Sequence, residues 1–203
     1  MGAIAPALYL VTDRQATRGR DLVAVVAEAV GAGLPAVQVR EKDLPRVERL
    51  ALCHRLRDVT RAAGATLFVN GDVELAREVG ADGVHRPHNL VILLEDAEAL
   101  RVAGSTHSLI EARQAQDDGL DFILFGPVYD TPSKRAYGPP QGVEALRRII
   151  ESVTIPVLAI GGVTPERVRE VRAAGAAGVA VISAVLSAES PGLATGRLLE
   201  ALA

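Results

Sequence analysis

Eight short apolar runs, each followed by a segment with helical periodicity, recur along the chain at intervals of about 25 residues. The runs are rich in valine, isoleucine and leucine, which is typical of strands buried on both faces of a parallel sheet. Parallel neighbours need a crossover connection, usually a helix, so the alternation predicts a parallel sheet with helices outside it. Eight such units favour closure into a barrel. We therefore expect an α/β fold, a (β/α)8 TIM barrel, with residues 1–203 forming a single domain.

The bounds of the predicted elements follow from these runs and from the residues that flank them. The predicted strands span residues 8–13, 36–42, 66–70, 83–86, 104–107, 122–128, 156–162 and 178–184. The predicted helices span residues 21–32, 45–63, 73–80, 90–103, 109–118, 143–152 and 164–175, and a last helix follows the eighth strand to the C-terminus. The polar stretch 129–140 is predicted to be a long loop.

The composition limits the classes of function that fit the chain. Its 203 residues are 49% hydrophobic and carry a formal net charge of −3, which is ordinary for a globular domain. Aromatic residues make up only 3% and there is no basic tract, so nucleic-acid binding has little support. No run approaches the roughly 18 apolar residues that span a bilayer, and no N-terminal signal is visible. The single cysteine, Cys53, cannot form an internal disulfide, which fits a cytoplasmic location.

The ends of the last two predicted strands carry the features of a phosphate site. Gly161 and Gly162 lack a Cβ, so the chain can turn tightly there and a bulky anion can approach the main chain. Ile182 and Ser183 lead into a helical run, whose N-terminus presents free N–H donors and the positive end of a dipole. In (β/α)8 barrels a phosphate cup lies after strands seven and eight, on the face that holds the active site.

Polar side chains alternate along the end of the second predicted strand. Gln38, Arg40 and Lys42 are spaced two apart, so we expect them to point to one side of that strand. Three inward polar groups are costly to bury without partners, which suggests a bound anion. The alternative is an inward ion-pair layer with a carboxylate from another strand. Asn70 ends the third predicted strand at the same face.

Histidine, hydroxyl and amine groups follow three other predicted strands. They are His85 and His88 after strand four, Ser105 and His107 at strand five, and Thr131, Ser133 and Lys134 in the loop after strand six. That loop could fold over a ligand as a lid. Lys42 and Lys134 are the only lysines among 22 basic residues, and both lie in these polar clusters. We expect the hydroxyl and amine groups to contact a substrate.

Six motifs occur in an order and spacing that resemble one enzyme superfamily. They are Gln38-Val-Arg40-Glu-Lys42, Gly80-Ala-Asp-Gly-Val-His85, Gly104-Ser-Thr-His-Ser108, Gly126-Pro-Val-Tyr-Asp-Thr-Pro-Ser-Lys134, Ala159-Ile-Gly-Gly162 and Val181-Ile-Ser-Ala184. Together they resemble the thiamin phosphate synthase superfamily, which also contains the thiazole tautomerases. The resemblance implies a (β/α)8 barrel with a thiazole phosphate on the backbone of Gly161, Gly162, Ile182 and Ser183.

For the synthase branch, the resemblance implies that a thiazole nitrogen displaces pyrophosphate from a pyrimidine pyrophosphate. The residues implied to hold that substrate are Gln38, Arg40, Lys42, Asn70 and Lys134. The reaction needs Mg²⁺, whose preferred ligands are carboxylates. The two aspartates of the family pattern fall on Gly71 and Leu90 here, so both implied metal ligands are missing, and Asp72 lies one residue late.

The tautomerase branch resembles this chain at those same two places. It has Asn-Gly after strand three, and His-Arg with a nearby proline after strand four. Its reaction moves a proton on a thiazole carboxylate phosphate to make the ring aromatic, and it needs no metal. The resemblance implies that His107 is the acid/base, a role that suits histidine. Arg40 is expected to bind the substrate carboxylate as a bidentate fork.

We therefore expect a metal-independent thiazole tautomerase of thiamin biosynthesis, without a cofactor, which acts on a small thiazole phosphate as a homodimer. The first alternative is a Mg²⁺-dependent thiamin phosphate synthase, favoured by the intact Thr131-Pro-Ser-Lys134 motif. The second alternative is a non-catalytic protein that binds thiazole phosphate or acts in regulation.

Overall fold

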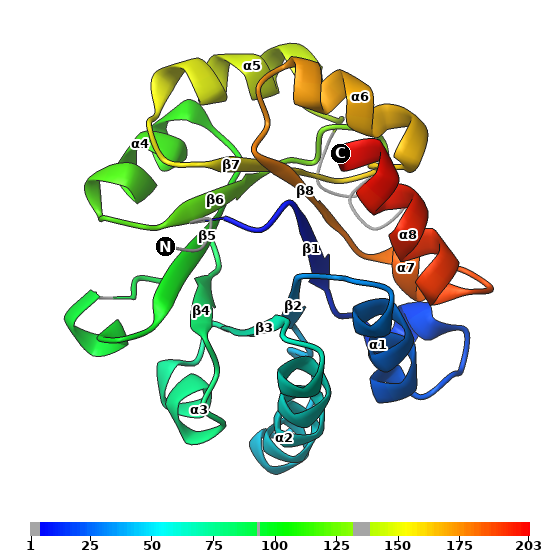
Figure 1. The fold of residues 1–203 in the computed structure, drawn as a ribbon. Helices are drawn as coiled ribbons and strands as arrows, with labels where there is room; N and C mark the ends of the chain where they lie inside the picture. The colour runs from blue at the N-terminus through cyan, green and yellow to red at the C-terminus, as the bar shows by residue number, and fades with distance from the viewer. Residues whose placement is uncertain (1–4, 93, 132–138) are drawn as a thin grey trace.

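The computed structural model describes residues 5–92, 94–131 and 139–203, and its strands form a closed barrel (Figure 1). The eight parallel strands follow one another in sequence order around the barrel, and the last pairs with the first. Their bounds are β1 Leu8–Val11, β2 Ala36–Val39, β3 Thr66–Asn70, β4 Gly83–Arg86, β5 Arg101–Thr106, β6 Phe122–Phe125, β7 Val157–Ile160 and β8 Gly178–Val181. The predicted (β/α)8 architecture is therefore confirmed.

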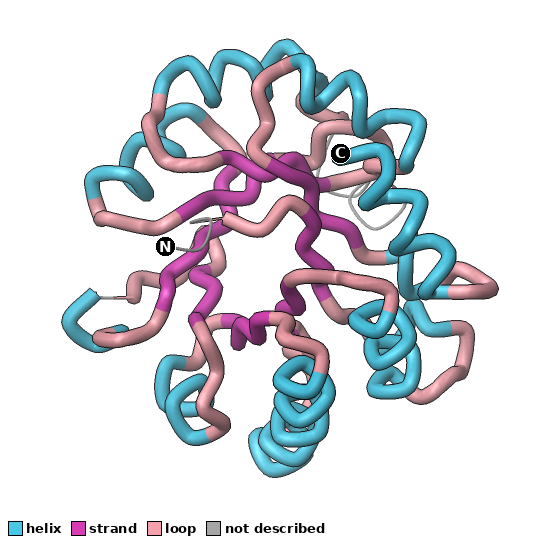
Figure 2. The backbone as a smooth tube through the Cα atoms, in the orientation of Figure 1, coloured by secondary structure: helices cyan, strands magenta, loops and turns pink. Residues whose placement is uncertain are grey.

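Helices pack around the outside of the barrel (Figure 2). The α-helices are α1 Leu22–Gly31, α2 Arg46–Ala62, α3 Val73–Glu78, α4 Leu109–Asp117, α5 Gly142–Ser152, α6 Pro165–Ala173, α7 Ser183–Leu186 and α8 Pro191–Leu202, and the 3₁₀ helices are η1 Arg14–Thr17 and η2 Leu94–Ala97. Over the ranges that the structure describes, no helix combines the length and the apolar character needed to cross a membrane.

The segment between β4 and β5 does not form the helix predicted over 90–103. Its described residues form the short η2, and β5 begins at Arg101 rather than at 104. The leucine, glutamate and alanine content of the segment favours a helix locally, but Ala99 has a left-handed backbone with φ 68°. Val102 and Ala103 are buried and pair with β4, so strand pairing prevails here over intrinsic helix propensity.

The end of the chain forms two helices where one was predicted. α7 ends at Leu186, and α8 starts at Pro191 after a turn. The Ser190 side chain caps α8 by accepting a main-chain N–H, and Pro191 occupies the first helical turn, where its missing N–H costs nothing.

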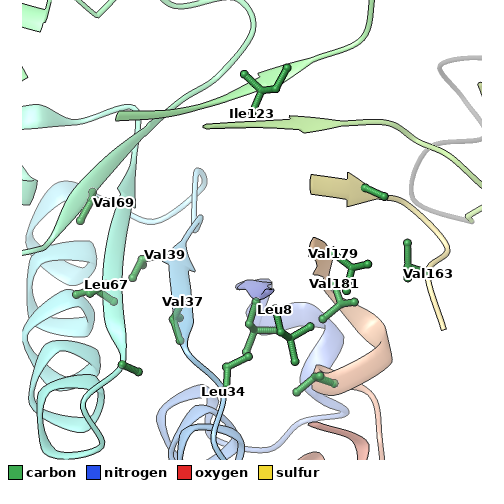
Figure 3. Close-up of a cluster of buried hydrophobic side chains, with 14 of the residues drawn as sticks. Leu8, Leu34, Val37, Val39, Leu67, Val69, Ile123, Val163, Val179 and Val181 are labelled. Atoms are coloured by element: carbon green, nitrogen blue, oxygen red, sulfur yellow. The ribbon is translucent and has the colours of Figure 1, made fainter. Parts of the chain in front are cut away.

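Outward-facing strand residues form the larger hydrophobic core. Leu8, Val37, Leu67 and Val179 project from the strands toward the helices, since successive side chains of a strand point to opposite faces (Figure 3). All four are fully buried. This layer attaches the helices to the barrel and leaves the inward-facing residues to decide what the barrel interior contains.

Three aromatic rings fill the interior near the N-terminal ends of the strands. Tyr9, Phe68 and Phe122 are fully buried and pack edge to face, with ring centroids between 5.4 and 5.8 Å apart. Such pairs add to the stabilisation from burial. The guanidinium of Arg101 lies 5.1 Å from the centroid of the Phe68 ring. Because the described side chains fill this half of the interior, the open space for a ligand is expected at the C-terminal ends of the strands.

A substitution at Gly83 of β4 tests how tightly this interior is packed. A Cβ at Gly83 would lie 2.4 Å from Cε1 of Phe68 and 2.6 Å from the carbonyl oxygen of Arg101. The carbonyl belongs to the main chain and cannot rotate away. We expect Gly83→Ala to lower the free energy of unfolding by about 2 to 3 kcal/mol, measured by chemical denaturation.

Gly31→Ala is the matched control, because a Cβ at Gly31, the last residue of α1, meets nothing within 4 Å. It should leave the stability unchanged or raise it by up to about 1 kcal/mol, since alanine is the better helix former. Equal effects of the two substitutions would contradict the packing described for the interior.

Candidate active site

Four polar side chains form a hydrogen-bonded layer above the aromatic rings. Gln38 of β2 donates through Nε2 to Oδ1 of Asn70 on β3 at 3.0 Å. His85 of β4 and Ser105 of β5 share a hydrogen bond of 2.7 Å between Nε2 and Oγ. The structure thus brings these four residues together in two neutral pairs, which gives buried polar groups the partners they need.

His85 is a buried neutral imidazole in this layer. Its side chain is 1% exposed, and burial, followed by the charges of Arg40 and Lys42, lowers its pKa to about 3. Nδ1 of His85 has no hydrogen-bond partner among the residues that the structure describes. A neutral ring that carries its hydrogen on Nε2 leaves no buried donor unpaired, and it donates to Ser105. The oxygen of the Ser105 hydroxyl then accepts this hydrogen bond, and the hydroxyl can donate its own hydrogen to another group.

Of Gln38, Arg40 and Lys42, only Gln38 lies within β2. β2 ends at Val39, and Lys42 is exposed. Glu41, which is 3% exposed, accepts hydrogen bonds from the main-chain N–H of Arg14 at 3.2 Å and from its guanidinium at 3.3 Å. The strand predicted over 36–42 is therefore too long, because the chain turns after Val39 and pairs Glu41 with Arg14.

Arg40 lies half-buried beside the polar layer. Its main-chain N–H donates to Oγ1 of Thr12 at 2.9 Å, and its charge acts on His85. Within the described ranges, the guanidinium of Arg40 forms no ion pair. The alternative of an inward ion-pair layer therefore gains no support at this residue, and the cation is available to an anionic ligand.

His107 follows β5 and is held on several sides. Its Nδ1 lies 2.5 Å from the carbonyl oxygen of Gly126, and because a carbonyl only accepts, Nδ1 carries the hydrogen. The main-chain N–H of His107 donates to Glu111 at 2.6 Å, and its carbonyl accepts from Gln141 at 2.6 Å. The exposed His88 packs edge to face on the His107 ring, with centroids 5.1 Å apart. In the neutral His107 ring, Nε2 is then an unprotonated base in a fixed orientation.

The turn after β7 and the start of α7 lie at neighbouring strand ends, because β7 pairs with β8. Gly161 and Gly162 have φ of 99° and 66°, a left-handed backbone that favours glycine. Ile182 is the residue before α7 and cannot cap it, so the first N–H groups of α7, from Ser183 onward, have no side-chain acceptor there. The four predicted phosphate-cup residues thus lie on two adjacent turns.

The two positions at which the resemblance implies metal-binding aspartates meet in space. A Cβ on Gly71 would lie 3.4 Å from Cδ2 of Leu90 and 3.4 Å from Cγ of Pro87, so carbon lines the place where Mg²⁺ needs oxygen. Asp72 does not replace the missing ligands. One of its oxygens caps α3 and the other pairs with Arg49 at 2.9 Å. The residues present here do not fit a magnesium ion.

The loop after β6 carries a residue, Tyr129, that lies within one of the six motifs but to which the sequence assigned no role. Tyr129 donates its hydroxyl to Glu170 of α6 at 2.5 Å, and its main-chain N–H to the carbonyl of Gly161 at 3.0 Å. Glu170 is 41 residues further along the chain, so no local pattern reveals the contact. Of the predicted loop residues, Thr131 is half-buried, whereas Ser133 and Lys134 lie outside the described residues.

The lowered pKa of His85 predicts a dependence of stability on pH. Below the ordinary histidine pKa of about 6.5 the unfolded chain binds a proton at this residue, whereas the folded chain does not until about pH 3. Stability is therefore lost as the pH falls through this range. By pH 5 the loss from His85 should reach about 2 kcal/mol. Denaturation of the wild type and of His85→Gln at pH 7 and pH 5 measures it, and the variant should show a smaller loss.

His54→Gln is the control for this measurement, because His54 is an exposed histidine on α2. It should keep the pH slope of the wild type. If His85→Gln also kept that slope, the imidazole would not be held neutral by burial.

Comparisons with known proteins agree on one family. Residues 8–185 match the TMP-TENI family, described as thiamine monophosphate synthase. A putative thiamine-phosphate synthase of Geobacter sulfurreducens is 45% identical over 188 residues, which cover 91% of this chain and 88% of that protein. A thiamine-phosphate synthase of Roseiflexus castenholzii is 41% identical over 202 residues, with coverage of 97% and 88%. The structure of a thiamine phosphate pyrophosphorylase from Pyrococcus furiosus superimposes with a TM-score of 0.87 at 38% identity, and the match covers 96% of this chain and 94% of that one.

The names of these relatives match the synthase branch of the superfamily rather than the tautomerase branch. The predicted superfamily is confirmed, whereas the assignment to the tautomerase branch finds no support in the names, which favour a synthase. The chain therefore belongs to the TMP-TENI family of thiamine-biosynthesis enzymes.

Proposed function

We propose that this chain is a metal-independent thiazole tautomerase, which moves a proton on a thiazole carboxylate phosphate and so makes the ring aromatic. The observation that carries the proposal is the close approach of Gly71, Leu90 and Pro87, where the resemblance implies two magnesium-binding aspartates. Asp72 is engaged by Arg49 and by a helix N-terminus. A reaction without a metal is the family chemistry that suits this arrangement.

His107 supplies the acid/base group in this proposal. With Nδ1–H on the carbonyl of Gly126, Nε2 can take a proton from one carbon of the substrate and return a proton to another. One C–H bond breaks, another forms, and the electron pair moves through the ring, so no redox partner is needed. The main-chain contacts of His107 with Glu111 and Gln141 keep the ring in place during the transfer.

The two anionic groups of the substrate have separate partners in this proposal. The phosphate binds main-chain N–H groups on the turns at Gly161, Gly162, Ile182 and Ser183. Arg40 takes the carboxylate as a bidentate fork. Two anchored anions would hold the ring in one orientation toward His107. Gln38, Lys42, Asn70, Ser105, Thr131, Ser133 and Lys134 are the further residues that we propose to contact the substrate.

A thiamine-phosphate synthase is the second candidate, and the names of the relatives favour it over the first. It would join a pyrimidine pyrophosphate to thiazole phosphate with Mg²⁺ and would use the same phosphate turns and cations. Its metal would need ligands other than residues 71 and 90, which are glycine and leucine. A protein that binds thiazole phosphate without turnover is the remaining alternative.

A two-part assay on the purified protein separates these functions. One part supplies the non-aromatic thiazole carboxylate phosphate with EDTA, and the other supplies pyrimidine pyrophosphate, thiazole phosphate and Mg²⁺. We expect aromatisation that EDTA does not slow, and no formation of thiamine phosphate. Mg²⁺-dependent formation of thiamine phosphate would establish the synthase instead. If neither reaction were detected, the remaining alternative would be a protein that binds thiazole phosphate without turnover.

The role of His107 gives a separate prediction. Asparagine at 107 can still donate to the carbonyl of Gly126 but has no basic nitrogen, so His107→Asn should lower kcat about 100-fold or more. His54→Asn, which changes an exposed histidine on α2, should leave kcat unchanged. Full activity of His107→Asn, with the wild type active, would exclude His107 as the acid/base.

A further inference from the structure

Arg167, in the first turn of α6, touches two loops at the mouth of the barrel. Its Nη1 donates to the carbonyl oxygen of Gly162 at 2.6 Å, on the turn after β7. The carbon of the same guanidinium lies 4.5 Å from the centroid of the Tyr129 ring, on the loop after β6. A planar cation over an aromatic face is a stabilising arrangement, and arginine forms it readily. One side chain therefore joins the two loops.

The two loops are also in direct contact beneath the guanidinium. A Cβ on Gly162 would lie 2.7 Å from the carbonyl oxygen of Asp130, 2.9 Å from Cβ of Tyr129 and 3.3 Å from Nη1 of Arg167. The main-chain N–H of Tyr129 donates to Gly161 at 3.0 Å. The orientation of the Gly161–Gly162 peptides is thus determined by neighbours on two sides, and Arg167 holds the carbonyl end of Gly162.

Among the described residues, no carboxylate lies within ion-pair distance of Arg167, although the neighbouring Glu166 interacts with its charge. Glu170, on the same helix, instead accepts the hydroxyl of Tyr129 at 2.5 Å. A positive charge therefore lies next to the glycine turn whose N–H groups carry the phosphate in the proposed function. The carbonyl of Gly162 shares its peptide unit with the N–H of Val163, and a peptide whose carbonyl binds a cation is a better N–H donor at its other end.

We propose that Arg167 is a positioning residue for the substrate phosphate: it holds the carbonyl oxygen of Gly162, so that the glycine turn keeps its orientation, and it adds positive charge beside the turn. The proposal rests on the phosphate cup of the proposed function and applies equally to a tautomerase and to a synthase. It predicts selectivity for phosphorylated ligands, which a purely structural link between two loops would not produce.

The test is binding of thiazole phosphate, and of the same thiazole without its phosphate, measured by calorimetry. Arg167→Met should weaken binding of thiazole phosphate by about tenfold and leave the phosphate-free thiazole within about twofold, since only the charge-assisted part of the affinity is lost. Arg167→Lys keeps a charged donor and should recover most of the affinity. Arg169→Met, which changes an exposed arginine on the same helix, is the matched control and should change neither affinity.

The outcomes separate this inference from the proposed function. Equal weakening of both ligands in Arg167→Met would show that Arg167 only supports the fold, and unchanged binding of both would show that it has no role, so either result overturns the inference. A wild type with no preference for the phosphorylated ligand would overturn the phosphate cup together with the inference. Selective loss in a protein that lacks tautomerase activity would uphold the inference while rejecting the proposed function.

Discussion

A buried polar group needs a partner, and this requirement decides which groups at the mouth of the barrel are left for a ligand. Inside the barrel two pairs of polar side chains hydrogen-bond to one another, Gln38 with Asn70 and His85 with Ser105. The groups above these pairs can interact with a ligand. They are the guanidinium of Arg40, Nε2 of His107 and main-chain donors on the turns after β7 and β8. The two neutral pairs therefore form a floor of uncharged groups on which a charged ligand can lie.

Apolar groups meet at the two positions where the family resemblance implies magnesium-binding aspartates, since a Cβ on Gly71 would lie 3.4 Å from Cδ2 of Leu90. Two positions that are distant in sequence are both apolar, and they lie against each other. Relatives that share more than two fifths of their residues with this chain are named synthases. The reaction that an enzyme catalyses depends on a few side chains of its site rather than on the fold as a whole. Overall similarity and local chemistry can therefore point to different reactions.

The order of the eight strands and the ends of β3 and β4 were predictable from the sequence, because each parallel strand is a short apolar run that polar residues follow. The same logic places Asn70, His85 and Ser105 at one face. Contacts between distant segments were not predictable. The buried pair of Glu41 with Arg14 shortens β2, and pairing with β4 turns the predicted end of a helix, at Val102, into strand. Local propensity carries no information about such partners.

The crowding at Gly162 couples the evolution of the loops after β6 and β7. The carbonyl of Asp130 and Cβ of Tyr129 occupy the space that any side chain at 162 would need. A side chain at position 162 would therefore be tolerated only if the loop that follows β6 adopted another conformation. A change in that loop, in turn, would require a matching change in the glycine turn. The loops after β6 and β7 should diversify as one unit, and a graft between relatives would have to transfer both.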